Sequence, residues 1–97
     1  MVTEIDNNFY KRADAVINLA NEQLDEVPIG KVSASCMYAT ARFNAWVSAC
    51  GHASSEEMAS AKDETVEYFT RQYRAMLTEN IDDYITNFNN YMQAQDA

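Results

Sequence analysis

Residues Lys31 to Gly51 read KVSASCMYATARFNAWVSACG, and this stretch decides the fold. Arg42 is the only charged side chain in its interior, and almost every other residue is small or apolar. A helix of this composition has no full side that suits water, because apolar surface gains free energy when it leaves water. We therefore predict a central helix that other helices cover on two faces.

The two predicted faces of this helix differ in bulk. At about 100° per residue, the bulky face suits a core and contains Val32, Cys36, Ala39, Phe43, Trp46, Val47 and Cys50. The opposite face is rich in alanine, lets another helix approach closely, and contains Ala34, Met37, Tyr38, Ala41, Ala45 and Ala49. Each face needs a partner, either from this chain or from a copy of it. Gly51 is expected to end the helix in the left-handed conformation.

A first helix is predicted from Asp6 or Asn7, either of which can cap it, to about Glu26. Pro28 and Gly30 break the chain after it. Its apolar residues recur at steps of three and four, which predicts an amphipathic helix lying on a core. They are Phe9, Ala13, Val16, Ile17, Ala20, Leu24 and Val27.

A long C-terminal helix is predicted from Ser55 to Met92, because this range contains neither Gly nor Pro and keeps an apolar stripe. Ser54 and Glu57 have the spacing of a capping box at its start. Uninterrupted, the helix would span roughly 57 Å, which is longer than either other helix can cover. Either its far end reaches a second subunit, or it breaks near residues 78–80, where Thr78 or Asn80 could cap a fourth helix.

The predicted fold is therefore all-α, a three-helix bundle-like arrangement in a single domain over residues 1–97. A domain of this size buries a modest fraction of its surface, so pairing with a second copy is expected.

Charge narrows the classes of partner. The chain has 7 Lys and Arg against 15 Asp and Glu, for a net charge of -8. This balance argues against binding to nucleic acid, which needs clustered cations. An acidic decoy of a nucleic-acid enzyme is a minor alternative to an ordinary solvated surface. No apolar run reaches about 18 residues, and the N-terminal MVTEIDNN does not resemble a signal peptide, so we expect a cytoplasmic protein without membrane contact.

The sequence offers no constellation for catalysis, a cofactor or a metal. His52 is the only histidine, the two glycines form no phosphate loop, and no Glu-x-x-His pair is present. Cys36 and Cys50 would stand about 21 Å apart on one helix, too far for a disulfide, and are expected to be buried reduced thiols. We predict a protein that is not an enzyme and has no catalytic, cofactor-binding or metal-binding residue.

Two polar side chains in the central helix are candidates for burial. Arg42 and Asn44 need polar partners if they are buried, and pairing within the protein is the expected role. The alternative is a pocket that binds a small ligand through Arg42, Asn44 and Trp46.

The candidate interface combines the alanine-rich face with aromatic residues near the C-terminus. Small residues allow close helix contact, and aromatic residues at helical spacing usually build a core or an interface. The candidate residues are Ala34, Met37, Tyr38, Ala41, Ala45, Tyr84, Phe88 and Tyr91.

Three phrases resemble the DUF3144 family of small bacterial and phage-associated proteins. They are FYKRADAVINLANEQ at Phe9 to Gln23, VSASCMYATARFNAWV at Val32 to Val47, and EYFTRQYRAMLTENIDDYITNF at Glu67 to Phe88. The resemblance implies a compact, all-helical bacterial protein and supplies no activity. We therefore expect a self-associating interaction or structural protein, a dimer in the first instance, with room for an unidentified protein partner.

Overall fold

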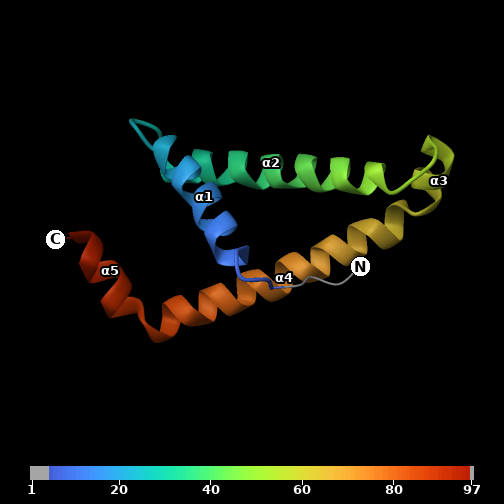
Figure 1. Ribbon diagram of the computed structural model, residues 1–97. Helices are drawn as coiled ribbons and strands as arrows, with labels where there is room; N and C mark the ends of the chain where they lie inside the picture. The colour runs from blue at the N-terminus through green and yellow to red at the C-terminus, as the bar shows by residue number, and fades with distance from the viewer. Residues whose placement is uncertain (1–4, 97) are drawn as a thin grey trace. The chain divides into compact units, whose positions relative to one another are not determined.

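A computed structural model describes residues 5–96, which contain five helices and no strand (Figure 1). The helices are α1 (Phe9–Glu22), α2 (Ile29–Cys50), α3 (Ser55–Ser60), α4 (Lys62–Thr86) and α5 (Phe88–Asp96). The all-α prediction is confirmed, but the helices number five where three or four were expected. Contacts within the chain group into two units, Met1–Val47 and Ser48–Ala97. The expectation of one domain stays a prediction.

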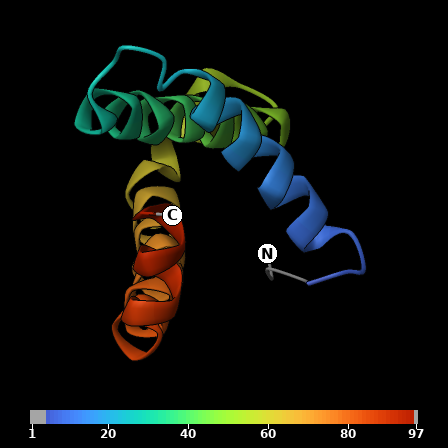
Figure 2. The same ribbon diagram turned by 90° about the vertical axis from the view of Figure 1, so that its left-hand side faces the viewer.

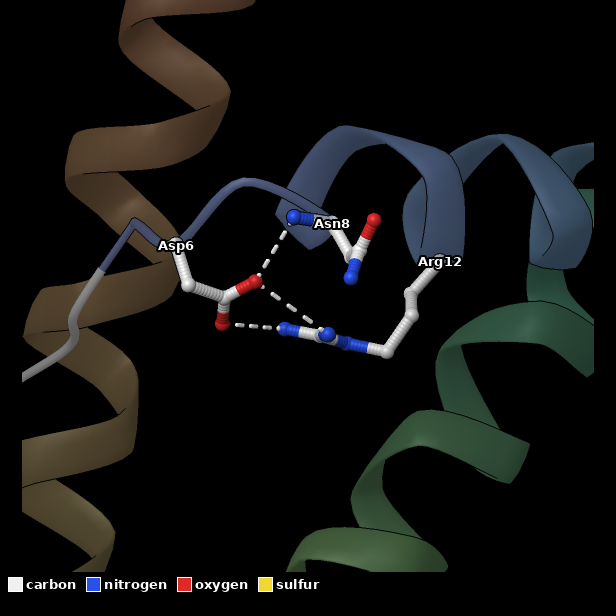
Figure 3. Close-up of polar contacts among 3 residues, drawn as sticks. All are labelled: Asp6, Asn8 and Arg12. Carbon is white, nitrogen blue, oxygen red and sulfur yellow. Dashed lines mark hydrogen bonds and ion pairs between the residues drawn. The ribbon is translucent and has the colours of Figure 1, made fainter.

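Asp6 lies just before α1 and forms hydrogen bonds with residues at the helix start. Its Oδ1 accepts a hydrogen bond from the Asn8 backbone N–H at 2.8 Å, and its backbone oxygen accepts one from Phe9 N–H at 3.1 Å. The carboxylate also accepts hydrogen bonds from both terminal nitrogens of Arg12, from Nη1 to Oδ1 at 3.3 Å and from Nη2 to Oδ2 at 2.7 Å (Figure 3). The predicted N-cap at Asp6 or Asn7 is therefore wrong by one or two residues, because Asn8 is the N-cap, no side chain caps α1, and Asp6 bonds to the residues around the helix start.

The connection between α1 and α2 is longer than predicted, and α2 begins at Ile29, before the expected break residue Gly30. The first helix ends at Glu22, before the expected Glu26, and short bonds close its last turn, from Gln23 N–H to Ala20 O at 3.0 Å and from Leu24 N–H to Asn21 O at 3.1 Å. Glu26 has a φ of 62° and lets the chain reverse into α2 (Figure 2). The left-handed conformation is sterically unfavourable for any residue that has a Cβ, so this turn is locally strained.

The first unit buries little of its apolar surface. Val32, at 9% exposure, is the one buried residue among those described. Phe9, Ala13 and Ala20 are half-buried on one side of α1, and Leu24 is half-buried in the turn after it. Within this unit α1 does not cover α2 on two faces, because both the bulky and the alanine-rich faces keep exposed side chains, and the expected covering of both faces by helices of this chain or of a copy stays a prediction.

The end of α2 also differs from the prediction. No described glycine has a positive φ, so Gly51 does not act as a left-handed terminator. Instead, Gly51 N–H donates to Ser48 O at 3.0 Å and His52 N–H donates to Ala49 O at 3.2 Å. These bonds tighten the last turn and satisfy carbonyls that a helix end leaves free.

In the second unit, the predicted start at Ser54 is correct. Ser54 Oγ accepts a hydrogen bond from Glu57 N–H at 3.1 Å and caps α3. The long helix is then interrupted at Ala61, whose φ of -95° and ψ of 1° leave the helical range. Ala61 N–H donates a bifurcated hydrogen bond to Glu57 O at 3.3 Å and to Met58 O at 3.2 Å. The predicted continuous helix from Ser55 to Met92 is therefore wrong at this point.

The expected break near residues 78–80 is also wrong, because α4 runs through it. Asn80 Nδ2 donates to Met76 O at 2.8 Å, so this side chain bonds back to the preceding turn and caps no new helix. The break occurs later, at Asn87, with φ -111° and ψ 23°. There α5 leaves the direction of α4 (Figure 1).

Candidate interaction surface

The alanine-rich face of α2 is exposed along its whole length. Ala34, Met37, Tyr38, Ala41 and Ala45 all lie at the surface of the single chain, with Tyr38 72% exposed. At about 100° per residue, these residues fall within an arc of about 100°, so they share one side of the helix. The five α2 residues of the candidate interface therefore form one continuous row available to a partner.

The bulky face of α2 is less buried than predicted. Phe43 and Trp46 pack against each other with ring centroids 5.6 Å apart, yet both are 61% exposed. Cys36 and Val47 are half-buried, and both cysteines are free thiols, with Cys50 exposed. The expected burial of Cys50 is thus wrong for the single chain. This face offers further apolar surface besides the alanine row.

The corner between α4 and α5 is built around one carboxylate. Asp83 Oδ1 accepts a hydrogen bond from Asn87 Nδ2 at 2.9 Å, and its two oxygens lie 3.3 and 3.1 Å from Tyr91 Oη. Asn87 Nδ2 also reaches Asp83 O at 3.2 Å. The carboxylate raises the pKa of Tyr91, because its hydrogen bond favours the protonated phenol. These bonds fix α5 to the end of α4.

Aromatic residues cover this corner. The rings of Tyr84 and Tyr91 meet edge to face with centroids 4.9 Å apart. Phe88, which lies between them in the sequence, is exposed. All three candidate interface residues of the C-terminal region are therefore exposed, and two of them touch. Sequence reasoning missed Asp83 and Asn87, although the spacing of Asp83, Asn87 and Tyr91 at two successive steps of four places them on one helix face.

The polar residues of α2 lie differently from the expectation. Arg42 is exposed and Asn44 is half-buried, so the predicted burial of Arg42 is wrong for the single chain. The ion pairs within residues 5–96 involve Arg12, His52 and Arg71, and none of them involves Arg42. Arg42 is thus a surface cation on the same side of α2 as Tyr38 and Ala45.

The other titratable side chains form small local pairs. His52 Nδ1 lies 3.2 Å from Glu57 Oε1, in the turn that leads into α3, and the His52 side chain is 19% exposed. Arg12 lowers the pKa of Asp6, with a further contribution from the Asn8 N–H bond. Over residues 5–96, no group of three or more His, Cys, Asp or Glu side chains is arranged to hold a metal ion. Within the same range, no helix combines the length and apolar character needed to cross a membrane.

Comparison with known proteins adds a family and a structure. The model of the family described as "Protein of unknown function (DUF3144)" matches residues 9–85, which confirms the resemblance of the three sequence phrases. The NMR structure of the protein NB7890A from Shewanella sp is similar, with 40% identity and a TM-score of 0.75. That alignment covers 95% of this chain and 98% of the other. No curated protein matches the chain.

Proposed function

Because the chain belongs to the DUF3144 family, whose function is unknown, we propose a role from the surface of the chain itself. In this proposal the protein is a self-associating, non-enzymatic interaction protein of the bacterial cytoplasm. Two copies pair through the alanine-rich face of α2 and through the region around Tyr84, Phe88 and Tyr91.

The surface area of the chain carries this proposal. A globular protein of 11.0 kDa is expected to expose about 5,600 Å², whereas this chain exposes 8581 Å². Even two separate globular proteins of half this mass would together expose only about 6,800 Å². The remaining excess of about 1,800 Å² is more than twice the roughly 800 Å² that each partner contributes to an interface of standard size.

Much of this surface is apolar and belongs to large side chains. Along α2, Met37, Tyr38, Phe43 and Trp46 are exposed, and Ile85 in α4 is 69% exposed. Isolated apolar residues on a surface are ordinary, but contiguous rows of them usually mark interaction sites. A second copy would cover these rows and supply the apolar burial that a chain of this size lacks on its own.

The ligand-pocket alternative gains no support from these positions. Arg42 is exposed and Trp46 is 61% exposed, so neither side chain is held in an enclosed space by its own chain. Pockets for small molecules normally bury most of the ligand among converging side chains. We therefore keep self-association as the single proposal.

A charge placed in the alanine row tests the proposal. Ala41→Glu keeps a good helix former but would bury an unpaired carboxylate, which costs more than about 1.4 kcal/mol and so weakens the dimer at least tenfold. Ala59→Glu in α3 is the matched control, since Ala59 is an exposed helical alanine outside both candidate regions. Analytical ultracentrifugation should give a raised dissociation constant for the first variant alone. Equal dissociation constants for the two variants would contradict the proposed interface.

A further inference from the structure

The exposed face of α2 is cationic as well as apolar. Helix α2 contains Lys31 and Arg42 and no acidic residue, in a chain whose net charge is -8. At about 100° per residue, both cations fall within about 40° of Tyr38, on the alanine-rich side. Both are exposed. Any partner that covers this row must therefore accommodate two positive charges.

The distal part of the C-terminal region has the opposite charge. Glu79, Asp82 and Asp83 lie beyond Arg74, and no Lys or Arg follows them. Ile81 and Ile85 are exposed on one face of α4, Asp82 lies at the border of this face, and Phe88 is exposed at the start of α5. Asp83 is bound to Asn87 and Tyr91, so the acidic groups of distal α4 that remain are Asp82, about 60° round the helix from Ile85, and Glu79, about 60° further round.

These charges discriminate between the ways in which two copies can pair. Placing α2 against α2 of a second copy would bring four cations together, and pairing the two distal regions would bring acids together. Like charges at a contact cost free energy, whereas opposite charges stabilise it and set its register. We infer that α2 of one copy docks on the distal α4 and α5 region of a second copy, so that the dimer contains two equivalent contacts of this kind.

This inference rests on the proposed self-association and specifies which elements meet. A two-fold axis turns one such contact into two, because each copy offers both surfaces. The excess surface of about 1,800 Å² per chain is enough for both, given about 800 Å² per partner in a standard interface.

Charge reversal on each surface and on both tests the pairing. The first variant is Lys31→Glu with Arg42→Glu, the second is Glu79→Lys with Asp82→Lys, and the third combines all four changes and restores the wild-type net charge. Lys11→Glu with Lys62→Glu controls for net charge, since both lysines lie outside the two surfaces. Dissociation constants are measured by sedimentation at low and high salt.

We expect each two-residue variant to weaken the dimer about tenfold or more, since reversal turns attraction into repulsion in both equivalent contacts. The four-residue variant should recover the wild-type dissociation constant, and the control should stay within about threefold of it. High salt should reduce all these differences.

Other outcomes would overturn the pairing in different ways. If the wild type dimerises but the first variant dimerises equally well, α2 does not face acidic residues of the partner, and the proposed function stands without this inference. If reversal lowers the unfolding temperature equally at every protein concentration and leaves the dissociation constant unchanged, the charges act within one chain. A wild type that stays monomeric removes the proposed function and the pairing together.

Discussion

At the scale of single residues, the ends of the helices depend on a few side chains. Asp6 stabilises the start of α1 through its bonds to Asn8 and Arg12, and Ser54 caps α3. Glu26 reverses the chain between α1 and α2 with a positive φ. Changes at these positions should alter local stability without changing the exposed surfaces.

Glu26→Gly should stabilise the protein. Glycine adopts a φ of 62° without the steric cost of a Cβ, and this gain exceeds the added entropy of the unfolded chain, so the free energy of unfolding should rise by about 0.5–1 kcal/mol. Asp14→Gly is the control, because Asp14 lies exposed inside α1, where glycine should lower the free energy of unfolding by about 0.5–1 kcal/mol. Urea unfolding measures both. A loss of stability in Glu26→Gly would show that the turn depends on its side chain.

Asp6→Asn should weaken the start of α1 in a pH-dependent way. Arg12 lowers the pKa of Asp6 in the folded chain, so the stabilisation is present above the unfolded pKa and is lost as pH falls through the lower, folded value. The variant should show less helix than the wild type at neutral pH and the same helix content once the wild-type carboxyl is protonated in acid. Circular dichroism over pH measures this difference.

Asp14→Asn is the matched control for that titration, since Asp14 is an exposed acid of the same helix outside the Asp6 and Arg12 pair. Its helix content should follow the wild type at every pH. A difference between Asp6→Asn and the wild type that persists unchanged into acid would contradict the role of the ionised carboxylate.

At the scale of helices, local signals predicted some boundaries and missed others. The turn after α1 follows from Pro28 and the α3 cap from the spacing of Ser54 and Glu57, signals that act over a few residues, whereas Gly30, also expected in the turn, lies in α2. The breaks at Ala61 and Asn87 carry no Gly or Pro. The break at Asn87 is accompanied by side-chain bonds to Asp83, and periodicity alone cannot reveal such bonds.

Asp83→Asn should loosen the corner between α4 and α5. The carboxylate holds the Tyr91 phenol and raises its pKa, so its neutralisation should return the pKa of Tyr91 towards the ordinary value. The corner contact is present below the unfolded pKa of Tyr91 and is lost as pH rises through the folded value. NMR titration of the Tyr91 ring measures the pKa.

Asp82→Asn removes the neighbouring charge and serves as the control, since the phenol of Tyr91 bonds to Asp83. It should leave the Tyr91 pKa close to that of the wild type. An unchanged pKa in Asp83→Asn would mean that the carboxylate does not hold the corner.

At the scale of the whole molecule, composition predicted apolar helices but could not say what covers them. The apolar rows of α1, α2 and α4 are visible in the sequence, yet Val32 alone is buried among the described residues. The candidate interface residues were identified because small and aromatic side chains recur at helical spacing. Burial depends on long-range contacts, which a periodic pattern does not specify, and Arg42 was misplaced for that reason.

The central claim is that a second copy covers the apolar surface that one chain leaves exposed. Sedimentation equilibrium of the wild-type protein at tens of micromolar tests it most directly. We predict a mass of twice the 11.0 kDa of the chain, falling towards one chain only on dilution. A mass of one chain at every concentration would contradict the account.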